Sequence, residues 1–69
     1  MKVIYDPGTD TLSILLKDNP VAESDELKEG LVVDYDRSGK IVSIEILDAS
    51  EMVSEPKGIQ YEMKEIKAV

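Results

Sequence analysis

The strongest constraint on the fold of this chain is a period-two alternation of apolar and polar residues, which turn sequences interrupt at short intervals. Successive side chains of a β-strand point to opposite faces, so this period predicts strands with one apolar face. The alternation is clearest over 31–36 and 40–47, on either side of the turn sequence RSG. The segments 2–5 and 11–17 flank the sequence DPGTD, in which Pro and Gly favour a turn. The pattern predicts two antiparallel hairpins, with Val42 and Ile44 in the core.

Two further segments leave strand and helix both open. Residues 22–29, AESDELKE, lack a proper apolar face, so an edge strand or an irregular segment is favoured over a short helix. Charged side chains on an edge strand also discourage one sheet from pairing with another. Over 59–64 apolar and polar residues alternate, which favours a final strand, although 61–67 also fits one or two helical turns.

A short helix is expected after the last regular strand. Asp48 is a candidate N-cap, and Glu51 follows three residues later, as in a capping box. The helix, 49–54, would end before Pro56. Together the elements predict an α+β, mostly β fold: an antiparallel β-meander of four to six strands with one short helix near the C-terminus.

Four pieces of sequence resemble one small prokaryotic family in their order and spacing. They are Tyr5-Asp6-Pro7 followed by Asp10, Leu12 and Ile14; Val21-Ala22-Glu23-Ser24; GLVVDYD at 30–36 with Gly39; and IEILDAS at 44–50. Over about residues 1–51 the chain resembles the family catalogued as domain of unknown function 2283. The resemblance implies a short β-rich domain, on which 52–69 would pack as a C-terminal extension within a single domain. It carries over no catalytic residue.

The composition excludes several kinds of chemistry. The chain has no Cys, His, Trp or Phe, and its 8 basic and 15 acidic residues give a net charge of −7. No thiolate or imidazole can therefore serve as a nucleophile or a soft-metal ligand, and no disulfide can stabilise the fold. The cations are scattered, so direct binding of nucleic acid is not expected. No apolar stretch approaches the roughly 18 residues of a membrane span, and without a signal peptide the expected location is cytoplasmic.

The sharpest chemical signal is a partial calcium-loop pattern that starts at Asp34. Counted from there, Asp36, Ser38 and Glu45 fall where such a loop places oxygen ligands, and Gly39 falls at its glycine position. A calcium hand needs helices on both sides, whereas both flanks here alternate as strands. A hairpin turn is the preferred interpretation, which leaves Asp34 and Asp36 as weak candidates for a metal site. No cofactor and no catalytic residue is assigned.

The remaining carboxylates and the aromatics have structural interpretations. Asp6 and Asp10 flank the first turn and are expected to bond its backbone. The three tyrosines are expected to contribute area to the core and to leave their hydroxyls at its rim. They are Tyr5, Tyr35 and Tyr61.

The two faces of the predicted sheet suggest association between copies of the chain. Besides the apolar face, the opposite face carries four large aliphatics, too much apolar surface to leave in water. They are Leu15, Val32, Ile41 and Leu47. Since a core this small rarely supplies more than about 3–5 kcal/mol, a homo-oligomer, most simply a dimer, is expected.

Three functions remain open from the sequence, and the first is favoured. It is a non-enzymatic cytoplasmic domain that acts through protein association, first with itself. The alternative is an antitoxin-like acidic binder of a small basic toxin or nuclease, prompted by toxin-like neighbours of such families. An enzyme with a carboxylate site at a dimer interface is placed last.

Overall fold

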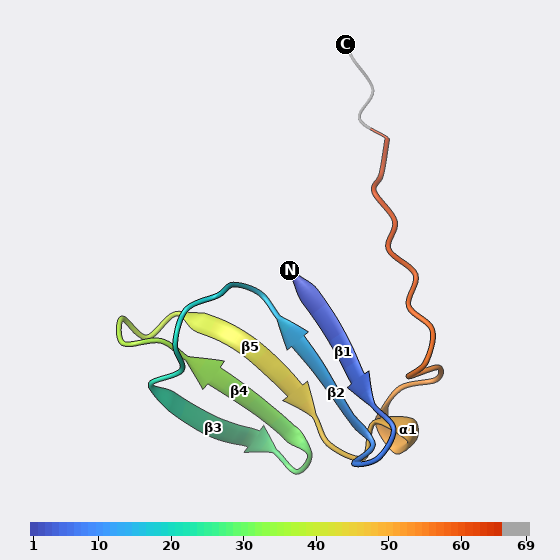
Figure 1. Ribbon diagram of the computed structural model, residues 1–69, viewed down its shortest axis with the longest axis horizontal. Coiled ribbons are helices and arrows are strands. Elements are labelled where there is room, and N and C mark those ends of the chain that lie inside the picture. The colour runs from blue at the N-terminus through green and yellow to red at the C-terminus, as the bar shows by residue number, and fades with distance from the viewer. Residues whose placement is uncertain (66–69) are drawn as a thin grey trace.

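The strands form one five-stranded antiparallel sheet with the strand order β1-β2-β5-β4-β3 (Figure 1). The computed structural model describes residues 1–65. Its elements are β1 (Lys2–Asp6), β2 (Thr11–Leu15), β3 (Glu23–Lys28), β4 (Leu31–Tyr35), β5 (Ile41–Ile46) and the helix α1 (Ala49–Met52). This arrangement confirms the predicted fold class.

The two hairpins form where the alternation predicts them, and carboxylates hold both turns. Asp6 accepts a hydrogen bond from the Gly8 amide at 2.9 Å in the β1–β2 turn. Asp36 accepts from the amides of Ser38 and Lys40 at 2.9 and 3.0 Å in the β4–β5 turn. Asx side chains commonly stabilise turns in this way.

One long connection, 16–22, carries the chain from β2 to the far edge of the sheet (Figure 1). There β3 runs as the edge strand that is favoured for 22–29, and all six of its residues are exposed. The chain then returns through β4 to β5, which inserts between β4 and β2. The central pair of the sheet, β2 and β5, is therefore formed by strands that are far apart in sequence.

One face of the sheet, called here the apolar face, consists of two rows that run across β1, β2, β5 and β4. The first row is Val3, Ile14, Ile44 and Val33, and the second is Tyr5, Leu12, Ile46 and Leu31. The opposite side, called here the mixed face, also has two rows. They are Lys2, Leu15, Ser43, Asp34 and Ser24, and Ile4, Ser13, Glu45, Val32 and Glu26.

The core is small because no second layer covers the sheet in the described part of the chain (Figure 1). Within residues 1–65 the buried apolar residues are Val33, Val42 and Ala49. The prediction that Val42 is buried is confirmed, but Ile44 is only half-buried. The difference reflects a bulge in β5: Asp34 pairs with Ser43 and Tyr35 with Ile41, which leaves Val42 as the extra residue between them. There Leu16, at the end of β2, donates to the Val42 carbonyl at 2.8 Å.

The helix begins where it was expected and ends two residues early. The predicted N-cap role of Asp48 is wrong, because this residue has a left-handed backbone with φ of 51° and its side chain makes no cap hydrogen bond. The described residues beyond Met52 form neither the strand nor the helix that remained open for the C-terminal segment, and residues 66 and 67 of that prediction lie outside the described residues.

Candidate functional site

A buried carboxylate links three strands on the mixed face. Asp34 is only 5% exposed. Its two oxygens accept from the hydroxyls of Ser24 on β3 and Ser43 on β5, each at 2.6 Å. Burial raises the pKa of Asp34, but the hydrogen bonds from Ser24, Ser43 and Glu45 outweigh it and leave the pKa below its usual range. Asp34 is therefore a charged acceptor inside the sheet.

Glu45 lies beside Asp34 on the neighbouring row of the same face. Its hydrogen bond with Asp34 raises the pKa of Glu45, and burial and the negative charge of Asp34 act in the same direction. The opposite shifts mean that Glu45 retains its proton to higher pH while Asp34 stays ionised. Such a pair resembles the acid and base of a hydrolase, but both Asp34 oxygens are already engaged by hydroxyls of the sheet. The cluster thus links β3, β4 and β5 through hydrogen bonds between side chains.

Asp36, the other weak metal candidate, belongs to a separate network in the β4–β5 turn. One of its oxygens accepts from the Ser38 hydroxyl at 2.8 Å as well as from turn amides. The other accepts from Asn19 at 3.2 Å and forms an ion pair with Lys17 at 3.2 Å. The Lys40 amide, followed by Ser38, holds the pKa of Asp36 far below its usual range. These contacts tie the 16–22 connection to the turn.

The structure thus uses Asp34 and Asp36 in two different networks. Glu45, the last ligand of the calcium-loop pattern, lies within β5 and not at the turn. Among residues 1–65, no group of three or more acidic side chains is arranged to hold a metal ion.

Asp10 has a role that its position in the first turn did not indicate. Its carboxylate accepts from the Tyr5 hydroxyl at 2.7 Å, and from the amide and hydroxyl of Ser50 at 3.0 and 2.6 Å. Its own carbonyl accepts from the Ala49 amide at 2.8 Å. Asp10 therefore caps α1 from the β1–β2 turn, in place of Asp48. No local sequence signal identifies a cap that lies forty residues from its helix.

The hydrogen bonds of Asp10 shift two pKa values in opposite directions. Those from Ser50 and Tyr5 lower the pKa of Asp10, because they stabilise its charged form. The same bond raises the pKa of Tyr5, because a hydroxyl that donates to a carboxylate holds its proton more tightly.

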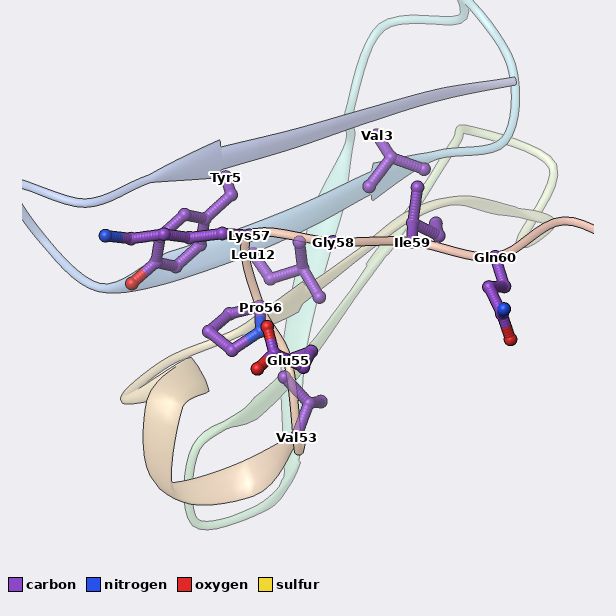
Figure 2. Close-up of a pocket in the computed structure, with 10 residues that line it drawn as sticks. All are labelled: Val3, Tyr5, Leu12, Val53, Glu55, Pro56, Lys57, Gly58, Ile59 and Gln60. Atoms are coloured by element: carbon purple, nitrogen blue, oxygen red, sulfur yellow. The ribbon is translucent and has the colours of Figure 1, made fainter.

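A groove lies where the C-terminal segment passes over the apolar face. Figure 2 shows residues 53–60 beside Val3, Tyr5 and Leu12 of β1 and β2. The groove has a volume of about 340 Å³, and Ile59 lines it next to these sheet residues. Its floor therefore belongs to the same apolar rows that run across the sheet.

Beyond this groove the chain leaves the body of the protein. The segment 57–65, called here the C-terminal arm, begins in this groove, and its later part runs away from the sheet in Figure 1. The expectation that Tyr61 contributes to the core is wrong, because it is 81% exposed, whereas Tyr5 and Tyr35 are half-buried as expected. The C-terminal arm thus carries apolar side chains that are exposed beside the apolar face.

Comparison with known proteins gives one match. The family model described as "Protein of unknown function (DUF2283)" matches residues 2–50, which span all five strands and the beginning of α1. No curated protein and no solved structure matches the chain. No helix in the described residues has the length and apolarity to cross a membrane.

Proposed function

The chain belongs to the DUF2283 family of proteins of unknown function, and from this premise we propose that it is a non-enzymatic domain that associates with a second copy of itself. The observation that carries the proposal is the apolar face, over which the C-terminal segment passes only beside Val3, Tyr5 and Leu12. Of the eight residues in its two rows, Val33 is buried and the other seven are half-buried, so each of the seven retains apolar area that a partner can cover. A contiguous apolar surface of this kind usually marks an interaction site.

The exposed area of the chain supports an interface of normal size. The accessible surface is 5923 Å², whereas a compact monomer of 7.7 kDa exposes about 4,300 Å². The difference is an excess of roughly 1,600 Å². A standard interface buries about 800 Å² on each partner, so a second copy can bury a full interface without disturbing the fold.

The distribution of charge is compatible with this pairing. On the side of the apolar face, β3 places Asp25 next to Val33 and Glu23 next to Tyr35. These acids form a rim at the sheet edge and leave the two apolar rows uncharged. Repulsion between two chains of charge −7 then acts mainly through solvent, where physiological salt screens it over about 8 Å.

Sedimentation equilibrium at tens of micromolar protein in moderate salt tests the proposal. We expect a species of twice the 7.7 kDa chain mass. Ile14→Thr lies in the middle of the apolar face and should weaken the dimer at least tenfold. Ile4→Thr is the matched control on the mixed face, whose aliphatics the sequence alone suggested for pairing, and Ile4 is 42% exposed. A wild-type monomer, or equal effects of the two variants, would contradict the proposal.

One observation favours a second candidate, a basic protein partner. The exposed edge strand β3 carries Glu23, Asp25 and Glu26 along an open backbone. Edge strands can accept a further strand, and acidic side chains would select a basic one. Co-purification from the protein's own cells should then recover a basic protein with the wild-type chain, but not with the variant E23Q/D25N/E26Q. Equal recovery with both chains would remove this candidate.

A further inference from the structure

The C-terminal arm has the alternating pattern of a β-strand, but among residues 1–65 no strand pairs with it. Its apolar side chains are largely exposed: Ile59 by 69%, Tyr61 by 81% and Met63 by 83%. They alternate with Gln60, Glu62 and Lys64, so an extended arm has one apolar side and one polar side. The backbone groups of an extended segment without a neighbouring strand are free to pair with a further strand, and the described residues place none beside the arm.

We propose that the arms of two copies pair with each other as an antiparallel β-ribbon, with Tyr61 of each arm at the two-fold axis. The proposal rests on the self-association proposed above and names a second contact within that dimer. A two-fold interface joins the same segment of both copies, so an arm that pairs with itself closes the assembly.

The arm's own sequence selects this register. With Tyr61 at the axis, Ile59 faces Met63 of the other arm, and Lys57 faces Glu65. Residues opposite each other in an antiparallel pair point to the same face, so the apolar side chains form one continuous row. An opposite-charge pair then closes each end of that row.

The two neighbouring registers that also place a residue on the two-fold axis bring like charges opposite each other. With Gln60 at the axis, Glu55 would face Glu65 and Lys57 would face Met63. With Glu62 at the axis, two Glu62 side chains would oppose each other. Like charges directly opposite are destabilising. An axis that lies between two residues would instead place each apolar side chain of one arm opposite a polar residue or Gly58 of the other.

The ribbon would continue the apolar face. Ile59 already lines the groove beside Val3, Tyr5 and Leu12, where the arm begins (Figure 2). The apolar row of the ribbon therefore starts at the surface through which the two sheets are proposed to associate.

Disulfide trapping tests the register, because the chain contains no Cys and each introduced thiol is unique. Three full-length variants, Gln60→Cys, Tyr61→Cys and Glu62→Cys, are oxidised separately with oxidised glutathione, and covalent dimer is followed on non-reducing gels. Thiols at the axis lie within the Cα separation of about 4.4–6.8 Å that a disulfide needs. We expect Tyr61→Cys to cross-link at least tenfold faster than the other two variants.

A mixing experiment checks the pairing away from the axis. Ile59→Cys or Met63→Cys alone should cross-link slowly, because the two identical positions lie four residues apart along the ribbon, or about 13 Å. An equal mixture of the two variants should give a covalent heterodimer rapidly. Since these side chains are exposed in the single chain, the substitutions leave the sheet folded, and circular dichroism verifies this.

The outcomes separate this proposal from the one on which it rests. Equal cross-linking rates for the three axis variants, or no heterodimer from the mixture, would overturn the ribbon. A dimer that Ile14→Thr still disrupts would then leave self-association intact. Rapid cross-linking together with no effect of Ile14→Thr would instead support the ribbon and exclude the apolar face as the interface. A wild-type monomer would overturn both.

Discussion

At the residue scale, Asp10 does the most to join distant parts of the chain. It connects the β1–β2 turn, the Tyr5 side chain on the apolar face and the first turn of α1. A charged acceptor forms stronger hydrogen bonds than a neutral one, so the three bonds depend on the ionised carboxylate. Its ionisation is therefore coupled to the stability of the helix.

The first prediction concerns Asp10→Asn. The variant should have a lower Tm at pH 7, and the pKa of Tyr5 should fall back toward its ordinary value of about 10. Because folding lowers the pKa of Asp10, its contribution is fully present above the unfolded value of about 4 and is lost as pH falls through the folded pKa. The difference in Tm from wild type should thus be large at pH 7 and should shrink steadily as the pH is lowered below about 4.

Thermal melts by circular dichroism and the ultraviolet titration of tyrosine check this prediction. Asp6→Asn serves as the control, since Asp6 accepts only the Gly8 amide within the same turn. A Tyr5 pKa unchanged by Asp10→Asn would contradict the assigned network.

The second prediction concerns Glu45→Gln on the mixed face. Folding raises the pKa of Glu45, so this residue stabilises the fold below its unfolded pKa of about 4.3 and loses that contribution as pH rises through the folded pKa. A glutamine keeps a donor toward Asp34 and adds no charge. The variant should be more stable than wild type at neutral pH, by up to about 1 kcal/mol for such a cross-strand neighbour.

Urea denaturation at pH 7 and at pH 3.5 measures the effect. The advantage of Glu45→Gln should disappear at the lower pH, where Glu45 is itself protonated. Glu23→Gln is the control on the exposed edge strand and should change stability little. A variant less stable than wild type at pH 7 would show that Glu45 does not repel Asp34.

At the element scale, the bulge in β5 decides which side chains enter the core. It brings Val42 to 3% exposure and leaves its neighbour Ile41 at 43%. We predict that Val42→Ala costs about 1.5–3 kcal/mol, the value of burying a valine side chain, and that Ile41→Ala costs less than about 1 kcal/mol. Ile41→Ala removes more atoms than Val42→Ala, so a smaller loss of stability for Ile41→Ala would be due to the exposure of Ile41.

Urea denaturation of both variants at one protein concentration provides the comparison. Equal losses, or a larger loss for Ile41→Ala, would place the bulge elsewhere in β5 and change which residues face the core.

At the scale of the whole molecule, the net charge of −7 makes the proposed dimer sensitive to salt. Two like-charged chains repel each other, and salt shortens the range of that repulsion from about 30 Å at 0.01 M to about 10 Å at 0.1 M. We predict that the dissociation constant of the dimer falls severalfold over this range of sodium chloride, as measured by sedimentation equilibrium.

A complex with a basic partner would respond in the opposite direction, because salt screens attraction as well as repulsion. A dimer that salt weakens would therefore indicate that charged contacts hold it together, against the apolar interface proposed here.

The sequence by itself determined the local elements. Two hairpins, the edge strand and the start of the helix follow from period-two alternation and turn residues, because these features depend on neighbours within a few positions. It also indicated the carboxylates in the turns, of which Asp6 and Asp36 bond the amides beside them. The family resemblance, too, rests on local spacing, and the match over residues 2–50 agrees with it.

Only the tertiary structure decided what the distant segments do to one another. The insertion of β5 between β2 and β4 determines which residues lie side by side across the sheet. It also buries Asp34 between the hydroxyls of two serines and brings Asp10 to the helix. Pairing between strands thirty residues apart depends on packing across the whole sheet, for which no short window of sequence carries a signal. The same holds for the absent second layer, since a strand's alternation shows that one face is apolar and not what will cover it.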